Sequence, residues 1–210
     1  MENNNARLEA FSDGVFAIAI TLLIIEIKIP PIESVHNRHE LWLAFAHTWP
    51  SWSAFLLSFI TILITCVNHW HAFKLIHKSS PKFTYANGLL LLSMVIMPFP
   101  TAVVAEYLNS ENSDLAQPAI TLYCAVALLT NIAWLLMQYT ILHPESLLNP
   151  NVNINKVKKI NIYSRGGFAL YSFAFILSFW FPIAAFMIIA LSFLMWLVLG
   201  ISLKEERMTN

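Results

Sequence analysis

Long apolar stretches alternate with short polar breaks along the whole chain. Crossing a hydrocarbon core about 30 Å thick takes about 20 helical residues. Proline pairs or single prolines, such as Pro30–Pro31 and Pro81, follow several of these stretches and would end a helix there. We therefore predict an all-α transmembrane fold in which residues 1–210 form a single six-span membrane domain, a bundle of six helices. The predicted spans are residues 11–29, 49–70, 88–107, 119–142, 167–181 and 183–203.

The last apolar run, from Gly166 to Leu203, is too long for one crossing, and Pro182 divides it near its middle. We interpret it as two spans joined by a tight turn, with Trp180 at the membrane interface. The alternative is one long helix, kinked or partly re-entrant, which would place the C-terminus on the other side of the membrane.

The positions of the cationic residues favour six spans with both the N- and the C-terminus cytoplasmic. Of the 12 lysines and arginines, only Lys28 and Arg38 fall in predicted outside segments. Lysine and arginine concentrate in the cytoplasmic loops of membrane proteins. The ten in predicted inside segments are Arg7, Lys74, Lys78, Lys82, Lys156, Lys158, Lys159, Arg165, Lys204 and Arg207.

Composition and motifs exclude several function classes. Hydrophobic residues make up 58% of the chain and charged residues 11%, with a net charge of zero, so nothing favours a nucleic-acid partner. The chain lacks the G-x-S-x-G, H-E-x-x-H, P-loop and dinucleotide fingerprints, and we expect no enzyme activity and no cofactor. Cys66 and His69 would supply only two metal ligands, and His71 faces another side of the helix, so we expect no structural metal site.

Polar residues inside the spans are the candidate functional residues, because burying them in a membrane is costly. Arg7 and Asp13 lie six positions apart, about 240° around a helix, so each needs a partner on another helix or subunit. Asp13 is either an interfacial carboxylate near a helix N-terminus or a buried tether. We expect Asn68 and His69 to form hydrogen bonds between helices near the inner interface, where Asn87 also lies.

The first span carries a stripe at spacings of three and four, formed by Phe11, Gly14, Ile18, Thr21 and Ile25, with Leu22 on its shoulder. Periodicity alone favours ordinary helix packing over a pore lining for such a stripe. Thr21 is tolerated in it because its hydroxyl can bond the backbone carbonyl four residues earlier.

The motif Arg7-x-x-x-Phe11-Ser12-Asp13, at the start of the first span, resembles the signature of the lysosomal and endosomal potassium channel family. Further matches are Asn68-His69 with Phe73 in span two, and Asn87 with Pro98-Phe99-Pro100-Thr101 in span three. The segment Cys66–Trp70 departs from the family, which more often has a tryptophan ahead of a double histidine. The resemblance covers the six-span plan but is specific mainly from Arg7 to Thr101.

The resemblance implies a prokaryotic member with one six-helix repeat per chain, assembled as a homotetramer in a bacterial cell membrane. The first helices of four subunits would line a pore without a carbonyl filter. Ile18 would form a narrow hydrophobic gate and Thr21 a hydroxyl layer that gives modest selectivity, with Leu22 and Ile25 completing the wall. Potassium would pass transiently near Ile18 and Thr21. The motif residues would form an intracellular network that holds these helices: Arg7, Phe11, Ser12, Asp13, Asn68, His69 and Asn87.

Two other functions remain open at this point. One is a secondary transporter or proton-conducting pathway that uses Asp13, His69 and His71 as a relay. The other is a non-conducting membrane protein whose apolar stripe only packs subunits together.

Overall fold

The computed structural model describes residues 5–108, 113–143 and 147–205, and the inside residue Arg207 lies outside them. Within these ranges the helices are joined by short turns and extended segments, and the β-structure is one isolated antiparallel bridge between Ile76 and Leu148. The elements are α1 (Ala6–Leu22), η1 (Leu23–Glu26), η2 (Ile32–Ser34), α2 (Arg38–His47), α3 (Trp49–Leu75), α4 (Pro81–Ile96), α5 (Pro98–Tyr107), η3 (Ser113–Leu115), α6 (Ala116–Leu142), α7 (Ile154–Leu177) and α8 (Pro182–Glu205).

Four helical segments among the described residues are long and apolar enough to cross a membrane: Ala6–Glu26, Trp49–Leu75, Pro81–Tyr107 and Ala116–Leu142. They correspond to the first four predicted spans, which confirms the all-α membrane-protein class. The segments α7 and α8 are helices at the positions of the last two predicted spans.

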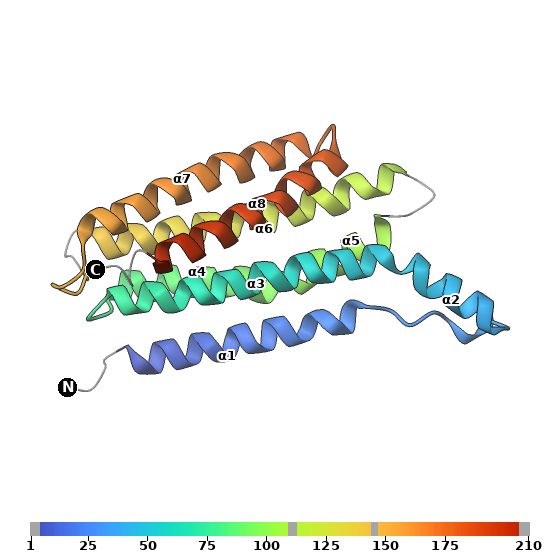
Figure 1. Ribbon diagram of the computed structural model, residues 1–210, viewed down its shortest axis with the longest axis horizontal. Coiled ribbons are helices and arrows are strands. Elements are labelled where there is room, and N and C mark those ends of the chain that lie inside the picture. Colours follow the sequence, from blue (N-terminus) through green and yellow to red (C-terminus); the bar gives the residue numbers. More distant parts are fainter. Residues whose placement is uncertain (1–4, 109–112, 144–146, 206–210) are drawn as a thin grey trace.

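The turn predicted at Pro182 is present. The helix α7 ends at Leu177, the amide of Phe181 donates to the Leu177 carbonyl across 2.8 Å, and α8 begins at Pro182. Proline suits the first position of a helix because its missing N–H would have no partner there. The two helices pack against each other as a hairpin, so the alternative of one long kinked helix is wrong (Figure 1). The start of α1 and the end of α8 therefore lie at the same end of the bundle.

The helices form an elongated bundle with α1 along one edge and α7 along the opposite edge (Figure 1). The central helix is α6, which packs against α4, α5, α7 and α8, whereas α1 packs mainly on α3 and α4. A buried core that includes Phe16, Met94, Tyr123 and Ile189 joins α1, α4, α6 and α8.

Two prolines interrupt the third apolar segment without breaking it. The helix bends at Met97 between α4 and α5, just before Pro98. The Thr101 hydroxyl donates to the Met97 carbonyl across 2.7 Å, and the buried hydroxyl of Ser58 lies 2.6 Å from that of Thr101 and 3.1 Å from that of Tyr123. Side-chain hydroxyls of α3 and α6 thus form buried hydrogen bonds beside the two prolines, where protein surrounds the interrupted helix.

Several helix bounds differ from the predicted spans. The helix α1 begins before the apolar run and tightens at Leu23 into the 3-10 turn η1, after which the backbone becomes extended at Ile27. The helix α7 begins at Ile154 and not near residue 167, since Asn153 accepts a bond from the Asn155 amide and starts it early.

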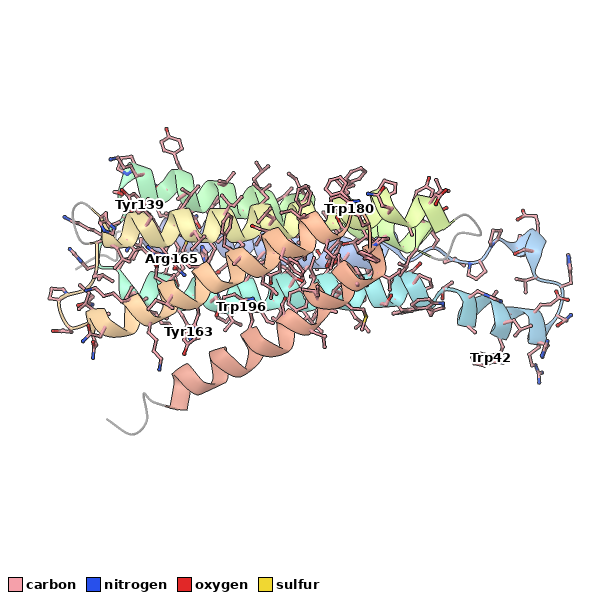
Figure 2. All side chains as sticks on the ribbon, turned by 90° about the horizontal axis from the view of Figure 1, so that it is seen from above. Trp42, Tyr139, Tyr163, Arg165, Trp180 and Trp196 are labelled. Carbon is pink, nitrogen blue, oxygen red and sulfur yellow. The ribbon has the colours of Figure 1, made fainter. Side chains whose placement is uncertain are left out.

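The helix α2 was not predicted. Asn37 accepts a hydrogen bond from the Glu40 amide while Glu40 accepts one from the His36 amide, a capping-box arrangement that starts the helix. No residue of α2 is buried, and Figure 2 shows Trp42 beyond the end of the bundle.

Candidate functional site

The helix α1 and the 3-10 turn η1 that continues it share one packed face and one open face, called below the faces of α1. Ser12, Phe16, Ala19 and Leu23 are buried against the neighbouring helices. The opposite face carries the predicted stripe, and its apolar members remain uncovered in a single chain. The exposed fractions are 63% for Phe11, 61% for Ile18, 40% for Leu22 and 71% for Ile25.

Thr21 lies on the open face between Ile18 and Ile25. Its hydroxyl lies 3.0 Å from the Ala17 carbonyl and 2.9 Å from the Ile18 carbonyl, to which it can donate its single proton. The oxygen lone pairs then remain as acceptors on the open face. The geometry therefore leaves Thr21 able to offer an oxygen to a cation but not a free donor to an anion.

A chain of hydrogen bonds ties α1 to α4 and α3 on the packed side. The Ser12 hydroxyl donates to the Leu8 carbonyl across 2.8 Å and accepts from Asn87 Nδ2 across 3.0 Å. His69 Nε2 lies 2.8 Å from Asn87 Oδ1, and it must be the donor because an amide oxygen only accepts. Ser12, His69 and Asn87 are all fully buried, so the chain joins three helices inside the protein.

Aromatic rings enclose the imidazole in this network. The His69 ring lies 5.2 Å from that of Phe16 and 4.6 Å from that of Phe73, which in turn contacts Phe83 at 5.3 Å between ring centres. His69 Nδ1 is buried and has no hydrogen-bond partner. The neutral form of His69, with its proton on Nε2, fits this apolar setting.

Asp13 has a partner that the sequence analysis missed. The Trp70 indole nitrogen on α3 donates to Asp13 Oδ1 across 2.7 Å. The bond fixes the carboxylate beside the buried network, in the N-terminal half of α1. The predicted role of Asp13 as a tether is consistent with this geometry. In the sequence, Trp70 stands out only because it belongs to the segment Cys66–Trp70, which departs from the family pattern.

The structure separates other predicted site residues from this network. Arg7 is exposed on the first turn of α1, and Asn68 lines a cavity on another side of α3. No hydrogen bond joins Asp13 to His69 among the described residues. The described part of the chain also has no group of three or more His, Cys, Asp or Glu side chains placed to hold a metal ion.

An ion pair holds the other end of the first segment. Lys28 Nζ lies 2.6 Å from Glu106 Oε2, which joins the chain just after η1 to the end of α5. This hydrogen bond and the charge of Glu106 raise the pKa of Lys28 above its ordinary value. The first segment is therefore fastened at both ends, while the open face between them is left uncovered.

Comparison with known proteins gives consistent relatives. Residues 7–98 match the family model described as the endosomal/lysosomal potassium channel TMEM175. The chain is 38% identical to a potassium channel of Chamaesiphon minutus over 196 residues, which cover 91% of this chain and 94% of that protein. It is 30% identical to a potassium channel of a Chryseobacterium species, with 95% of this chain and 98% of that protein covered.

Solved structures and an animal relative extend the comparison. The crystal structure of a lysosomal potassium-selective channel TMEM175 homologue from Chamaesiphon minutus matches with a TM-score of 0.83 at 35% identity, covering 93% of this chain and 97% of that one. The human endosomal/lysosomal proton channel TMEM175 is 28% identical over 179 residues, which cover 82% of this chain but 35% of that protein.

Proposed function

Because the chain belongs to the TMEM175 family of endosomal/lysosomal potassium channels, we propose that four copies of it assemble around a central axis into a potassium channel of a bacterial cell membrane. The family consists of ion channels and not of enzymes, and the chain is an integral membrane protein.

The observation that carries the proposal is the open face of α1. Ile18 and Ile25 are more than half exposed at the edge of the bundle, and either lipid or further copies of the chain would cover that face. One helix cannot enclose a pathway, but four copies related by a rotation axis can. The face opposite is fastened to α3 and α4, so the stripe would keep its orientation in the assembly.

The gate we propose is a ring of four Ile18 side chains. An apolar constriction of this kind excludes water and hydrated ions until it widens, so it closes by dewetting and needs no charged plug. Leu22 and Ile25 would continue the wall outward. A potassium ion would cross this stretch with part of its hydration shell removed.

Selectivity would come from four Thr21 hydroxyls one turn away from Ile18. Their free lone pairs could replace some of the water oxygens around a passing cation. Potassium holds its water less tightly than sodium, so the free-energy cost of replacing water by hydroxyl oxygens is lower for potassium. Because only four hydroxyls take part, the discrimination between the two ions would be modest. The site would hold the ion transiently near Thr21 and Ile18, with no resident metal.

The topology we propose has α7 and α8 as the fifth and sixth spans and both termini in the cytoplasm. Support comes from the common end of the bundle shared by the start of α1 and the end of α8 (Figure 1). It also comes from the ten lysines and arginines in the predicted inside segments. Membrane lipid would cover the outer surface of the assembly.

The buried network would act as a positioning device and not as an ion ligand. Ser12, Asn87 and His69 are closed off on the packed side of α1, away from the open face. With the Asp13–Trp70 bond, they would set the rotation of α1 about its own axis, and hence the direction in which Ile18 points. Arg7 and Phe11, both exposed, would contact neighbouring subunits.

A proton-conducting pathway is the second candidate function. The buried, unpartnered Nδ1 of His69 is a free proton acceptor at the depth of Asp13. The animal relatives are named proton channels, which gives this alternative a second support. It predicts a current that follows the proton gradient and not the potassium gradient.

Recording the purified protein in planar bilayers tests the proposed function. Unitary current steps with a reversal potential that follows the potassium gradient would support the channel. A reversal potential set by pH alone would favour the proton pathway, and flux without unitary steps would favour a transporter. A membrane that stays silent with verified insertion would contradict conduction altogether.

A further inference from the structure

A second polar site lies inside each subunit, apart from the face of α1. A cavity of about 70 Å³ is lined by residues of α3, α4, α6, α7 and α8 and by Met97, and α1 contributes none of its lining residues. Trp196, which lines it, lies near the middle of the bundle's length in Figure 2. Gly167 of α7 leaves the room for this arrangement, since a Cβ there would meet the Trp196 ring at 2.6 Å and Asn131 Nδ2 at 3.0 Å.

The cavity holds a polar atom that nothing in the subunit satisfies. Asn131 of α6 is only 6% exposed, and its Oδ1 has no hydrogen-bond partner. Buried amide oxygens are normally bonded, so an unpaired one in a cavity indicates a place for a hydroxyl donor, either a water molecule or a ligand.

The neighbouring threonine hydroxyls are acceptors too, while the Asn68 amide, which also lines the cavity, carries N–H donors that can bond a hydroxyl oxygen. The Thr65 hydroxyl donates to the Thr61 carbonyl across 2.8 Å and the Thr130 hydroxyl to the Val126 carbonyl across 2.9 Å. Their protons are used, and their lone pairs remain. The Trp196 indole proton is also taken, because it is donated to the Tyr171 hydroxyl across 3.1 Å.

The rest of the lining is largely apolar and aromatic, and no carboxylate lies among the residues that form the cavity. A cation would therefore find no counter-charge at membrane depth. Thr65, Trp134 and Trp196 are only half-buried, so the cavity is open on one side. These residues lie within long apolar helices, and the opening therefore faces the bilayer in the topology proposed above.

The size limits what can enter. An apolar cavity of about 150 Å³ takes a whole benzene ring, and this one has about half that volume. A hydroxyl group and its first methylene groups fit inside, while a longer body must remain outside. We propose that the cavity binds the hydroxyl head of an uncharged lipophilic alcohol, which donates to Asn131 Oδ1 while its chain extends through the opening into the bilayer.

Photolabelling of the full chain in lipid nanodiscs tests this site, with an octanol that carries a diazirine on its chain as the probe. Irradiation followed by peptide mass spectrometry should place saturable label on the cavity-lining parts of α3, α6 and α8. Unlabelled 1-octanol should compete, and 1-methoxyoctane, which lacks the donor, should compete about tenfold more weakly, the effect of one net hydrogen bond. Equal competition by the ether, or label spread evenly over the apolar surface, would overturn the proposal.

Single substitutions test whether the alcohol hydroxyl bonds Asn131 Oδ1. Asn131→Leu keeps the side-chain size and removes the acceptor, and should lower saturable labelling about tenfold. Thr130→Leu fills the cavity and should abolish labelling, which keeps the test decisive if the first variant does not fold. Thr140→Val on the same helix, outside the cavity, is the matched control and should label as the unaltered chain does. Unchanged labelling of a folded Asn131→Leu or Thr130→Leu protein would contradict the site, whatever the outcome for potassium conduction.

Discussion

Asn87 Nδ2 of α4 donates a hydrogen bond to the Ser12 hydroxyl of α1 across 3.0 Å, and both side chains are fully buried. This bond is the direct polar link between α1 and α4, and it continues through Asn87 Oδ1 to His69 of α3. The rotation of α1 is thereby coupled to two helices behind it, while its other face stays open. The orientation of that face is what the proposed function depends on.

Removing one partner of this link should weaken the fold. Ser12→Ala leaves an Asn87 amide hydrogen buried without an acceptor, and should lower the free energy of unfolding by about 1–3 kcal/mol. Thermal melting in detergent measures the change. Ser93→Ala is the matched control, because buried Ser93 bonds only the Leu90 carbonyl of its own helix. Equal melting temperatures for the two variants would mean that the link between α1 and α4 carries no special stability.

The Asp13–Trp70 bond should influence conduction more than stability. Trp70→Phe keeps an aromatic ring but removes the indole donor, so the Asp13 carboxylate loses its partner on α3. Because the pair is partly exposed, the cost in unfolding free energy should be about 0.5–1.5 kcal/mol. Open probability in bilayer recordings should change clearly, since the inner end of α1 would be less firmly held. Trp42→Phe on α2 is the control, and an identical effect of both variants would argue against a positioning role for the bond.

A polar residue in the proposed ring should open it. Ile18→Asn removes the apolar surface that keeps the constriction dry, so the resting potassium leak should rise several-fold. Single-channel and macroscopic currents in bilayers measure the leak. Leu56→Asn, at an exposed apolar position of α3, controls for a polar substitution on the outside of the subunit. A leak no larger in Ile18→Asn than in this control would remove Ile18 from the gate.

The hydroxyl at position 21 should matter more than its methyl group. Thr21→Ala removes the oxygen and should bring the potassium-to-sodium permeability ratio towards the unselective value. Thr21→Ser retains the hydroxyl and should preserve most of the ratio. Reversal potentials with potassium and sodium on opposite sides give both numbers. An unchanged ratio in Thr21→Ala would show that selectivity arises elsewhere.

Apolar patterning was enough to predict the four long membrane helices and the turn at Pro182, because membrane insertion and proline geometry act locally. The partner of Asp13 could not be predicted in the same way. Asn68, His69 and Trp70 are neighbours in sequence but point about 100° apart on the helix, so the one that faces α1 depends on the rotation of α3. Packing of the whole bundle sets that rotation, and it turns His69 and Trp70 towards α1 and Asn68 towards the cavity.

Other features depended on contacts between segments far apart in the chain. The unpaired Oδ1 of Asn131 arises where α6, α7 and α8 meet. Position 167 requires a glycine because the Trp196 ring of another helix leaves no room for a Cβ. The helix α2, in contrast, carries a local signal in its Asn37–Glu40 capping box that a search for apolar runs passes over.

The central claim is that the open face of α1 lines the ion pathway, and silver block of introduced cysteines tests it most directly. In a background with Cys66 and Cys124 replaced by alanine, Ile25→Cys and Leu23→Cys would be compared in the same bilayer recordings. Silver is close to potassium in size and reacts irreversibly with thiols that it reaches. The account predicts that silver abolishes most of the current of Ile25→Cys and spares Leu23→Cys, whose position is fully buried. Equal insensitivity of both, or block of Leu23→Cys alone, would contradict it.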